Sequence, residues 1–298
     1  MAHAEHGEGG RSGRILVTGA RGVVGRVVVA RLGPRAVPLS RQQLDICDPD
    51  QIERVLARWQ PVAVINAAAW ADVERCERDP DGAWQVNAWG PEQLARACAR
   101  HRVALVHVST DYVFGATNRE IYHRDSPTEP VNVYGKTKAE GELRVLDAWP
   151  RAAVARTAWV YGLEGRGFGL LAARRLRDRQ VLFAIQDRFG HPTWVEDLAD
   201  RLVALAERSV GGVHHAVNAG PTSWYRFALR LAQGLGTGDA RLAGISFRAL
   251  PSRVAPRPRR VRLETTEVPG SGLPPLRSWE QAQDAFLSAL ARATTTRD

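Results

Sequence analysis

The chain has 298 residues, of which 44% are hydrophobic, enough for one large domain or for a nucleotide-binding domain with a smaller partner. Its formal net charge is +9, and the densest basic cluster, at residues 253–262, holds five arginines but no aromatic residue that could stack on a base. We therefore expect no nucleic-acid partner, and the guanidinium groups would instead suit an anionic small substrate. No apolar run approaches the roughly 20 residues that cross a bilayer, so no membrane association is expected.

The amino terminus and the cysteines indicate a cellular compartment. Residues 1–13 are polar and rich in glycine and histidine, without the apolar stretch of a secretory signal, and we expect them to form a disordered leader. The three cysteines, Cys47, Cys76 and Cys98, are odd in number and lack C-x-x-C spacing, so they predict no disulfide framework. The cytoplasm is the expected location.

Short β-type runs alternate with helical stretches in the first half of the chain. The expected strands, apolar on both faces, are Arg14–Thr18, Ala36–Leu39, Val62–Asn66, Ala104–Ser109 and Ala152–Arg156. The expected helices between them are Val24–Leu32, Pro49–Trp59, Asp79–Arg100 and Tyr134–Trp149. This alternation is typical of a parallel sheet buried between two layers of helices.

Beyond Tyr161 the pattern becomes less regular. The expected elements are a loop at Gly162–Gly169, a basic helix at Phe168–Arg179, a strand at Val181–Ile185, a helix at Val195–Arg208, a last strand of the main sheet at Val213–Asn218 and a closing helix at Trp279–Ala291. The sequence predicts an α/β fold: a doubly wound (Rossmann) parallel sheet with a smaller, partly discontinuous C-terminal substrate-binding lobe. The nucleotide-binding domain is expected at residues 14–160 and about 195–220, and the lobe at 161–194 and 221–298.

A glycine-rich turn follows the first expected strand, with the spacing T-G-x-x-G-x-x-G. Its glycines permit a tight turn and let backbone N–H groups approach a pyrophosphate where the next helix begins. Between a strand and a helix, such a turn is typical of a dinucleotide site. The cofactor contacts expected here are Gly19, Arg21, Gly22, Val23, Val24 and Gly25.

The second expected strand ends in Leu39-Ser40-Arg41, where an NAD-binding protein would carry Asp or Glu for the ribose 2′-hydroxyl. A hydroxyl followed by a guanidinium suits a 2′-phosphate, which favours NADPH and leaves NADH as the alternative. Asp45 and Ile46 are expected to flank the adenine. After the third strand, small side chains would let the backbone approach the cofactor at Ala67, Ala68 and Ala69.

Tyr134 and Lys138 lie four residues apart, on one face of an expected helix. The fourth strand delivers Thr110 and Asp111 to the carboxyl edge of the sheet, where α/β sites lie. In carbonyl reduction a hydride reaches carbon while a proton reaches oxygen, and a tyrosine with a pKa of about 10 needs a nearby cation to act near neutrality. We expect Lys138 to supply that charge and to bind the nicotinamide ribose, and Thr110 to hydrogen-bond the substrate oxygen.

Lysine is rare in this chain: of 41 lysines and arginines only Lys136 and Lys138 are lysines. A lysine at position 138 therefore suggests a role that needs a compact ammonium group. Trp159 and Tyr161, after the fifth strand, are placed either to fill the core or to line a sugar pocket.

Several stretches together resemble one known family. T-G-x-x-G-x-x-G, N-A-A-A, S-T-D-Y-V-F (Ser109–Phe114) and V-N-V-Y-G-K-T-K (Val131–Lys138) resemble the dTDP-4-dehydrorhamnose reductases, which are extended short-chain dehydrogenases/reductases. The match is extended by R-T-A-W-V-Y-G (Arg156–Gly162), F-G-x-P-T (Phe189–Thr193) and R-P-x-x-x-R-L (Arg257–Leu263). The resemblance covers Arg14 to about Ala291.

The resemblance implies NAD(P)H-dependent reduction of the C4 ketone of a dTDP-4-keto-6-deoxyhexose. It implies Tyr134 as proton donor, Lys138 as the ribose-binding lysine and Thr110 as the hydroxyl. It also suggests Asp111, Trp159 and Arg262 as substrate or pocket residues. A loop at Gly115–Pro130 would cover the substrate.

The chain departs from the family pattern at three places. Some members dimerise through magnesium held by acidic residues, one of them just after the glycine turn, but Arg26 stands there and no metal is expected. A monomer and a homodimer both remain open. The aromatic-or-His-Thr pair usual after N-A-A-A is Trp70-Ala71, and Arg260 replaces the usual Asn of the last motif. These departures bear on which sugar is reduced.

Three functions remain at this point. The first is a simple 4-ketoreductase, serving rhamnose or a specialised deoxysugar such as one found on an antibiotic. The second is a ring-contracting reductase similar to dTDP-dihydrostreptose synthase. The third is a non-catalytic NADP-binding protein similar to a regulatory subunit of methionine adenosyltransferase, against which the retention of Thr110, Tyr134 and Lys138 argues.

Overall fold

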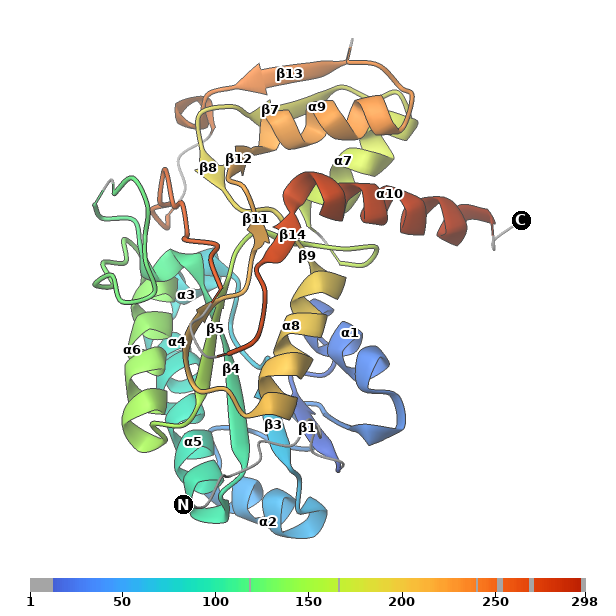
Figure 1. The fold of residues 1–298 in the computed structure, drawn as a ribbon. Coiled ribbons are helices and arrows are strands. Elements are labelled where there is room, and N and C mark those ends of the chain that lie inside the picture. The colour runs from blue at the N-terminus through green and yellow to red at the C-terminus, as the bar shows by residue number, and fades with distance from the viewer. Residues whose placement is uncertain are drawn as a thin grey trace, which may run out of the picture.

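The computed structural model describes residues 13–117, 119–165, 167–239, 241–250, 254–267 and 271–295. A parallel sheet with helices on both faces forms the larger part, and a smaller lobe of helices and short strands lies at the carboxyl end of this sheet (Figure 1). The leader expected at residues 1–13 lies, apart from Gly13, outside the described residues.

Six parallel strands form the central sheet in the order β10-β5-β4-β3-β1-β2. They are β1 (Ile15–Thr18), β2 (Ala36–Leu39), β3 (Ala63–Asn66), β4 (Ala104–Thr110), β5 (Ala153–Thr157) and β10 (Gly212–His215). The doubly wound α/β class expected from the sequence is confirmed.

Two layers of helices bury the sheet because its strands are apolar on both faces. Neighbouring residues of β1 show this: Leu16 packs in one buried cluster and Ile15 in the cluster on the opposite face. One layer contains α1 (Val23–Leu32) and α8 (Val195–Arg208). The other contains α2 (Pro49–Trp59), α5 (Gly90–His101) and α6 (Val133–Ala148).

The helix expected at Asp79–Arg100 is more complex than the sequence suggested. It begins as α4 (Pro80–Trp84), capped by the Asp79 carboxylate, passes through a π-helical turn, η2 (Gln85–Trp89), and continues as α5. A short helix that was not expected, α3 (Val73–Arg78), precedes it and is capped by Asp72. The π-turn contains the buried Asn87.

The strand expected at Val213–Asn218 is split, so that prediction was wrong at its end. β10 stops at His215, and Asn218 instead begins β11 (Asn218–Ala219), which pairs with β14 (Leu276–Ser278) in the lobe. The side chain of Asn218 explains the change of direction, because it accepts from the N–H of Trp194 and donates to the carboxylate of Asp197. The expected helix Phe168–Arg179 ends at Arg177.

The lobe draws its elements from separate stretches of the chain. Aromatic rings of Tyr161, Phe227 and Phe286 meet edge to face in its buried core. The elements are β6 (Val160–Tyr161), α7 (Phe168–Arg177), β7 (Leu182–Ile185), β8 (Phe189–Gly190), β9 (Thr193–Trp194), β12 (Thr222–Ser223), α9 (Trp224–Gly234), β13 (Leu242–Ile245) and α10 (Trp279–Thr295). Among the described residues, no helix combines the length and the hydropathy that a bilayer crossing requires.

The strand order creates one switch point, between β1 and β3. The chain leaves β1 toward β2 on one side and leaves β3 toward β4 on the other. The loops that follow these two strands therefore diverge and leave a crevice at the carboxyl edge, which is where doubly wound sheets bind ligands.

Candidate functional site

Two adjoining cavities lie at this edge of the sheet. The first has a volume of about 750 Å³ and the second about 500 Å³. Gly22, Ala67 and Ala69 line both, so the two cavities form one cleft. The cleft is lined by the ends of β1 and β3, and, in the second cavity, also by β4, α6 and the start of the lobe.

The glycine turn between β1 and α1 is packed too tightly for larger residues. Gly19 has a φ of +63°, and a Cβ there would lie 2.6 Å from the carbonyl oxygen of Ala67. A Cβ on Gly25 would lie 2.3 Å from the carbonyl oxygen of Gly19. Gly22 precedes α1 without a side-chain cap. The first N–H groups of this helix are therefore available to an anion.

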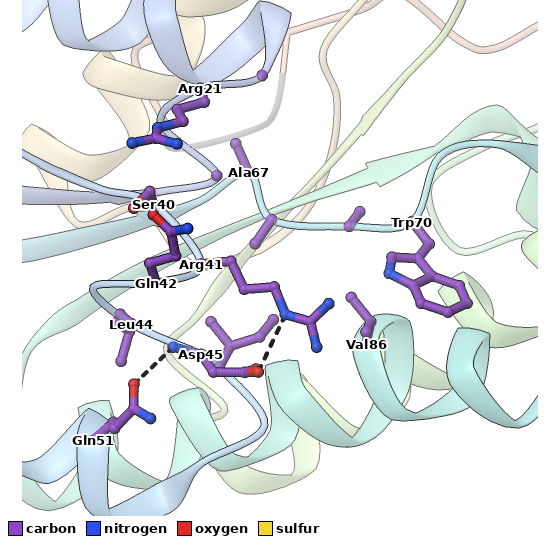
Figure 2. Close-up of a pocket in the computed structure, with 15 residues that line it drawn as sticks. Arg21, Ser40, Arg41, Gln42, Leu44, Asp45, Gln51, Ala67, Trp70 and Val86 are labelled. Carbon is purple, nitrogen blue, oxygen red and sulfur yellow. Dashed lines mark hydrogen bonds and ion pairs between the residues drawn. The ribbon is translucent and has the colours of Figure 1, made fainter.

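The opposite wall of the first cavity follows β2, as Figure 2 shows. Arg41 extends along the cavity with 71% of its side chain exposed, and its Nε lies 3.2 Å from Oδ2 of Asp45. The Ser40 hydroxyl donates to Gln43. The predicted residues that line the first cavity are Gly19, Arg21, Gly22, Ser40, Arg41, Asp45, Ile46 and Ala67–Ala69, and those that line the second are Val23, Val24, Gly25, Tyr134 and Lys138.

Trp70, one of the residues that depart from the family pattern, also lines the first cavity. The guanidinium of Arg75 lies 3.4 Å from the centre of its indole ring. The side chain of Asn87 accepts a hydrogen bond from the N–H of Trp70 and donates one to its carbonyl. The amide nitrogen of Asn87 also lies 3.2 Å from the Thr137 hydroxyl of α6. The π-turn thus connects the loop after β3 to the helix that carries Tyr134.

The second cavity brings Thr110, Asp111, Tyr134 and Lys138 together from β4, the 3-10 turn η3 (Asp111–Val113) and α6. Asn132 caps α6 by accepting from the N–H of Gly135 at 2.8 Å. A Cβ on Gly135 would lie 2.2 Å from the carbonyl oxygen of Tyr112, so glycine allows α6 to approach η3 closely. The four-residue spacing then turns Tyr134 and Lys138 toward the same cavity.

Burial sets the protonation of the central pair. It raises the pKa of Tyr134 above its ordinary value, opposed by a hydrogen bond with Thr110. It lowers the pKa of Lys138 to about 8, opposed by the charge of Glu142. The Lys138 amine donates to the carbonyl of Val108 at 2.7 Å and lies 3.1 Å from Nε2 of His107. Lys138 is thus held against β4, and the lowering of the Tyr134 pKa by its charge stays a prediction.

Asp111 is a buried carboxyl group, with 3% of its surface exposed. Burial raises its pKa to about 6, and the positive charge of Arg188 opposes that rise. The Thr110 hydroxyl lies 3.3 Å from its Oδ1. A carboxyl group with this pKa changes its charge close to neutral pH.

The sequence gave no indication of Arg188, although it directly precedes the F-G-x-P-T motif. Its side chain is 9% exposed and donates to the carbonyl of Pro258 at 2.8 Å and to the hydroxyl of Tyr112 at 3.0 Å. The rings of Tyr112, Trp159 and Phe247 lie 5.6–5.8 Å from the guanidinium carbon. No carboxylate of the described residues lies within salt-bridge distance of this cation. A buried charge without a direct ion pair is costly, and the nearby Asp111 offsets this cost only in part, which points to an anionic ligand.

Trp159 lines the second cavity, while Arg262 does not border either one. Trp159 has a φ of +45° and stacks on Trp224 at 4.4 Å, so its unusual backbone geometry is stabilised by packing. Arg262 lies between the buried residues Val261 and Leu263, and its Nε has no hydrogen-bond partner among the residues that the structure describes. Its contact with substrate stays a prediction.

Two arginines of the basic cluster at residues 253–262 are engaged by the protein itself. Arg257 pairs with Glu74 at 2.9 Å, and Arg260 lies over the ring of Phe189. Arg253 is outside the described residues. The expected loop at Gly115–Pro130 is closed at its base by a bridge between these two residues and is tied to Leu263 through Tyr122.

Comparisons with known proteins agree on one family. A family model described as "RmlD substrate binding domain" matches residues 13–292. A dTDP-4-dehydrorhamnose reductase of Streptomyces griseus is 38% identical over 286 residues, with 93% of this chain and 94% of the relative covered. A probable dTDP-4,6-dihydroxy-2-methyloxan-3-one 4-ketoreductase of Streptomyces antibioticus is 40% identical over 93% of this chain and 96% of its own length.

The structures agree as well. The crystal structure of dTDP-4-dehydrorhamnose reductase from Bacillus anthracis str. Ames in complex with NADP is 28% identical to this chain. It superimposes with a TM-score of 0.87, with 94% of this chain and 100% of that chain covered. The likeness therefore extends over both the sheet and the lobe.

Proposed function

The chain belongs to the dTDP-4-dehydrorhamnose reductase family, and we propose that it reduces the C4 ketone of a dTDP-4-keto-6-deoxyhexose with NADPH. The observation that carries the proposal is the convergence of Thr110, Tyr134 and Lys138 in a cavity continuous with the glycine turn. That turn fits a dinucleotide, since Gly19 and Gly25 let it pack closely against Ala67 and against itself, and Gly22 lines both cavities where a pyrophosphate would meet the start of α1.

Bound NADPH would supply the hydride, and the chain's own residues would handle the proton. Tyr134 would donate its phenolic proton to the developing alkoxide, and burial keeps this phenol protonated at neutral pH. Thr110 would hydrogen-bond the same oxygen. Lys138 would hold the ribose beside the nicotinamide. The adenine half would lie in the first cavity, with the 2′-phosphate at Ser40 and Arg41 and the adenine beside Asp45 and Ile46.

On the sugar-nucleotide side, Asp111, Trp159 and Arg262 would contact the substrate. Arg188 supplies a buried positive charge next to Asp111 and Trp159. The named relatives differ in the sugar that their names give, which is dTDP-4-dehydrorhamnose in one and dTDP-4,6-dihydroxy-2-methyloxan-3-one in the other. The exact sugar is therefore a matter for experiment.

The remaining expectations are proposals of the same kind. Cys47, Cys76 and Cys98 are unpaired thiols, which supports a cytoplasmic location. Residues 14–160 with about 195–220 would form the cofactor domain, and 161–194 with 221–298 the substrate lobe. Either a monomer or a homodimer is compatible with this site. The function requires no metal and no nucleic acid.

The test is NADPH oxidation by the purified protein against a panel of dTDP-4-keto-6-deoxyhexoses, with each product assigned by NMR. A pyranose reduced at C4 is the expected product. A furanose would show ring contraction and replace the simple reductase proposal. NADPH binding without oxidation across the whole panel would contradict an enzymatic function and favour the regulatory alternative.

A further inference from the structure

A chain of buried polar groups runs across three strands to Lys138. The Thr18 hydroxyl lies 2.6 Å from Oδ1 of Asn66, and the N–H of Ala68 donates to the same oxygen at 3.2 Å. The amide nitrogen of Asn66 lies 3.0 Å from Nδ1 of His107, and Nε2 of His107 lies 3.1 Å from Nζ of Lys138. Asn66 and Lys138 are 1% exposed and His107 is completely buried.

The backbone determines how the Asn66 amide is oriented. The N–H of Ala68 can only donate, so the oxygen of the Asn66 amide must be the atom that faces it. The NH₂ group then faces His107 and donates to Nδ1. His107 therefore carries its single proton on Nε2.

This tautomer determines which protonation state of Lys138 fits the hydrogen bonds around Nζ. The Nε2–H of His107 points at Nζ, which must accept this hydrogen bond while it donates another to Val108. An amine has one lone pair and can do both, whereas an ammonium has only donors. Burial acts in the same direction, because it lowers the pKa of Lys138 to about 8.

We propose that His107, oriented by Asn66, is a positioning residue that donates its Nε2–H to Lys138 and so stabilises the uncharged amine form of this side chain against β4, which lowers the pH at which Nζ gains its proton. The anionic phosphates of a dinucleotide would favour the ammonium form. Binding would then shift the protonation equilibrium of Nζ toward the ammonium, and the fraction of Lys138 that carries the charge required by Tyr134 would rise together with cofactor binding. This last step rests on the proposed function. The series of hydrogen bonds from Thr18 through Asn66 and His107 to Lys138, called the relay below, does not.

Other charges around Lys138 do not replace the relay. Glu142, one turn further along α6, raises the pKa of Lys138, but its carboxylate is shared with Arg156 in a buried ion pair and also accepts from Ser109. His107 itself stays neutral, because burial holds its pKa well below the ordinary value, and the charge of Lys138 acts in the same direction whenever Nζ is protonated. Further titratable groups on the elements packed against α6 include Glu74, Cys76 and Glu77 on α3, Asp81 on α4, Glu92, Cys98 and His101 on α5, and Asp111 and Tyr112 on η3.

The composition of the chain makes a direct test practical. With only two lysines in the sequence, protein labelled with ¹³C,¹⁵N-lysine gives two side-chain signals, and a Lys136→Arg variant assigns them. In the cofactor-free protein we expect Lys138 to titrate at about pH 8. His107→Gln presents a carbonyl oxygen that can accept from an ammonium, and should raise this midpoint by about one pH unit, the worth of one hydrogen bond. His214→Gln changes another buried histidine, on β10, and should leave the midpoint unchanged.

A second variant reverses the relay without removing it. In Asn66→Asp both side-chain oxygens accept, so His107 must move its proton to Nδ1 and present Nε2 to an ammonium. We expect ¹⁵N-histidine spectra to show the Nε2–H tautomer of His107 in the native protein and the Nδ1–H tautomer in Asn66→Asp. The Lys138 midpoint should rise in that variant.

Two results would overturn the proposal: an Nδ1–H tautomer in the native protein, or a Lys138 midpoint that His107→Gln leaves in place. The native tautomer decides the question even where a variant does not fold. Neither measurement needs substrate, so a failure of the relay and a failure of the reductase assignment give different results.

Discussion

The two cavities of the cleft are lined by different parts of the chain. Most of the residues that line the first follow directly after β1, β2 and β3, and only Gln51 of α2 and Val86 of η2 come from further along the described chain. The second depends on side chains from β4, α6 and residues 157–161, with Arg188 of the lobe behind them. Binding in the first is therefore a property of local turns, while the second exists only when distant segments pack together.

The largest effect should come from the second cavity, through Tyr134→Phe. Loss of the phenolic proton should reduce kcat by about 10²–10⁴-fold, the usual contribution of general acid catalysis. The dissociation constant for NADPH, measured by fluorescence titration, should stay within about twofold, because the first cavity is untouched. Tyr225→Phe, on α9, is the matched control and should change neither quantity. An unchanged kcat in Tyr134→Phe would remove this residue from the mechanism.

Gly25→Ala is the corresponding change in the first cavity. A methyl group 2.3 Å from the carbonyl oxygen of Gly19 must displace the turn, at a cost of about 1–3 kcal/mol. If that cost falls on cofactor binding, NADPH affinity should fall about tenfold to hundredfold, with little change in binding of the dTDP-sugar.

Gly33→Ala serves as its control. Gly33 also has a positive φ, +55°, but a Cβ there meets no atom of the described residues within 4 Å. This variant should lose about 1 kcal/mol of stability and keep its NADPH affinity. Equal losses of NADPH affinity in both variants would mean that general destabilisation, and not the turn, explains the effect.

The difference between the cavities also decides what the sequence could predict. The turn at Gly19–Gly25 and the Ser40-Arg41 strand end are contiguous motifs, and all of their predicted residues line the cleft. Arg188 could not be found in this way. It is a candidate site residue because it is buried beside Tyr112 and Trp159, and only tertiary packing brings these residues together. The split of the last strand depends on bonds from Asn218 to Trp194 and Asp197, and these too are invisible to local periodicity.

Arg188→Gln tests whether the buried charge of the second cavity serves the substrate. Hydrogen bonds made by a charged group are worth about 1.5–3 kcal/mol, so KM for the dTDP-sugar should rise at least about tenfold while NADPH affinity is kept.

The pH profile of Arg188→Gln gives a second measurement. The Arg188 cation favours the ionised form of Asp111, whose pKa is about 6, and its removal raises this pKa further. If activity requires the carboxylate, it falls in the native protein as the pH drops through about 6 and in the variant at a higher pH. An acid limb that does not move would show that Asp111 does not control the rate.

The smallest effect is expected from Arg41→Ala, at the solvent side of the first cavity. The side chain is 71% exposed, so its interaction with a 2′-phosphate is screened by water and should contribute at most about 1 kcal/mol. NADPH affinity should fall about threefold to fivefold, and NADH affinity should not change, since NADH lacks the 2′-phosphate that Arg41 would bind. The loss should shrink at high salt, and Arg54→Ala, an exposed arginine on α2, should have no effect. Equal losses of NADPH and NADH affinity would mean that Arg41 acts by holding Asp45 and thereby the wall of the first cavity in place. The first cavity would then depend on side-chain contacts, as the second does.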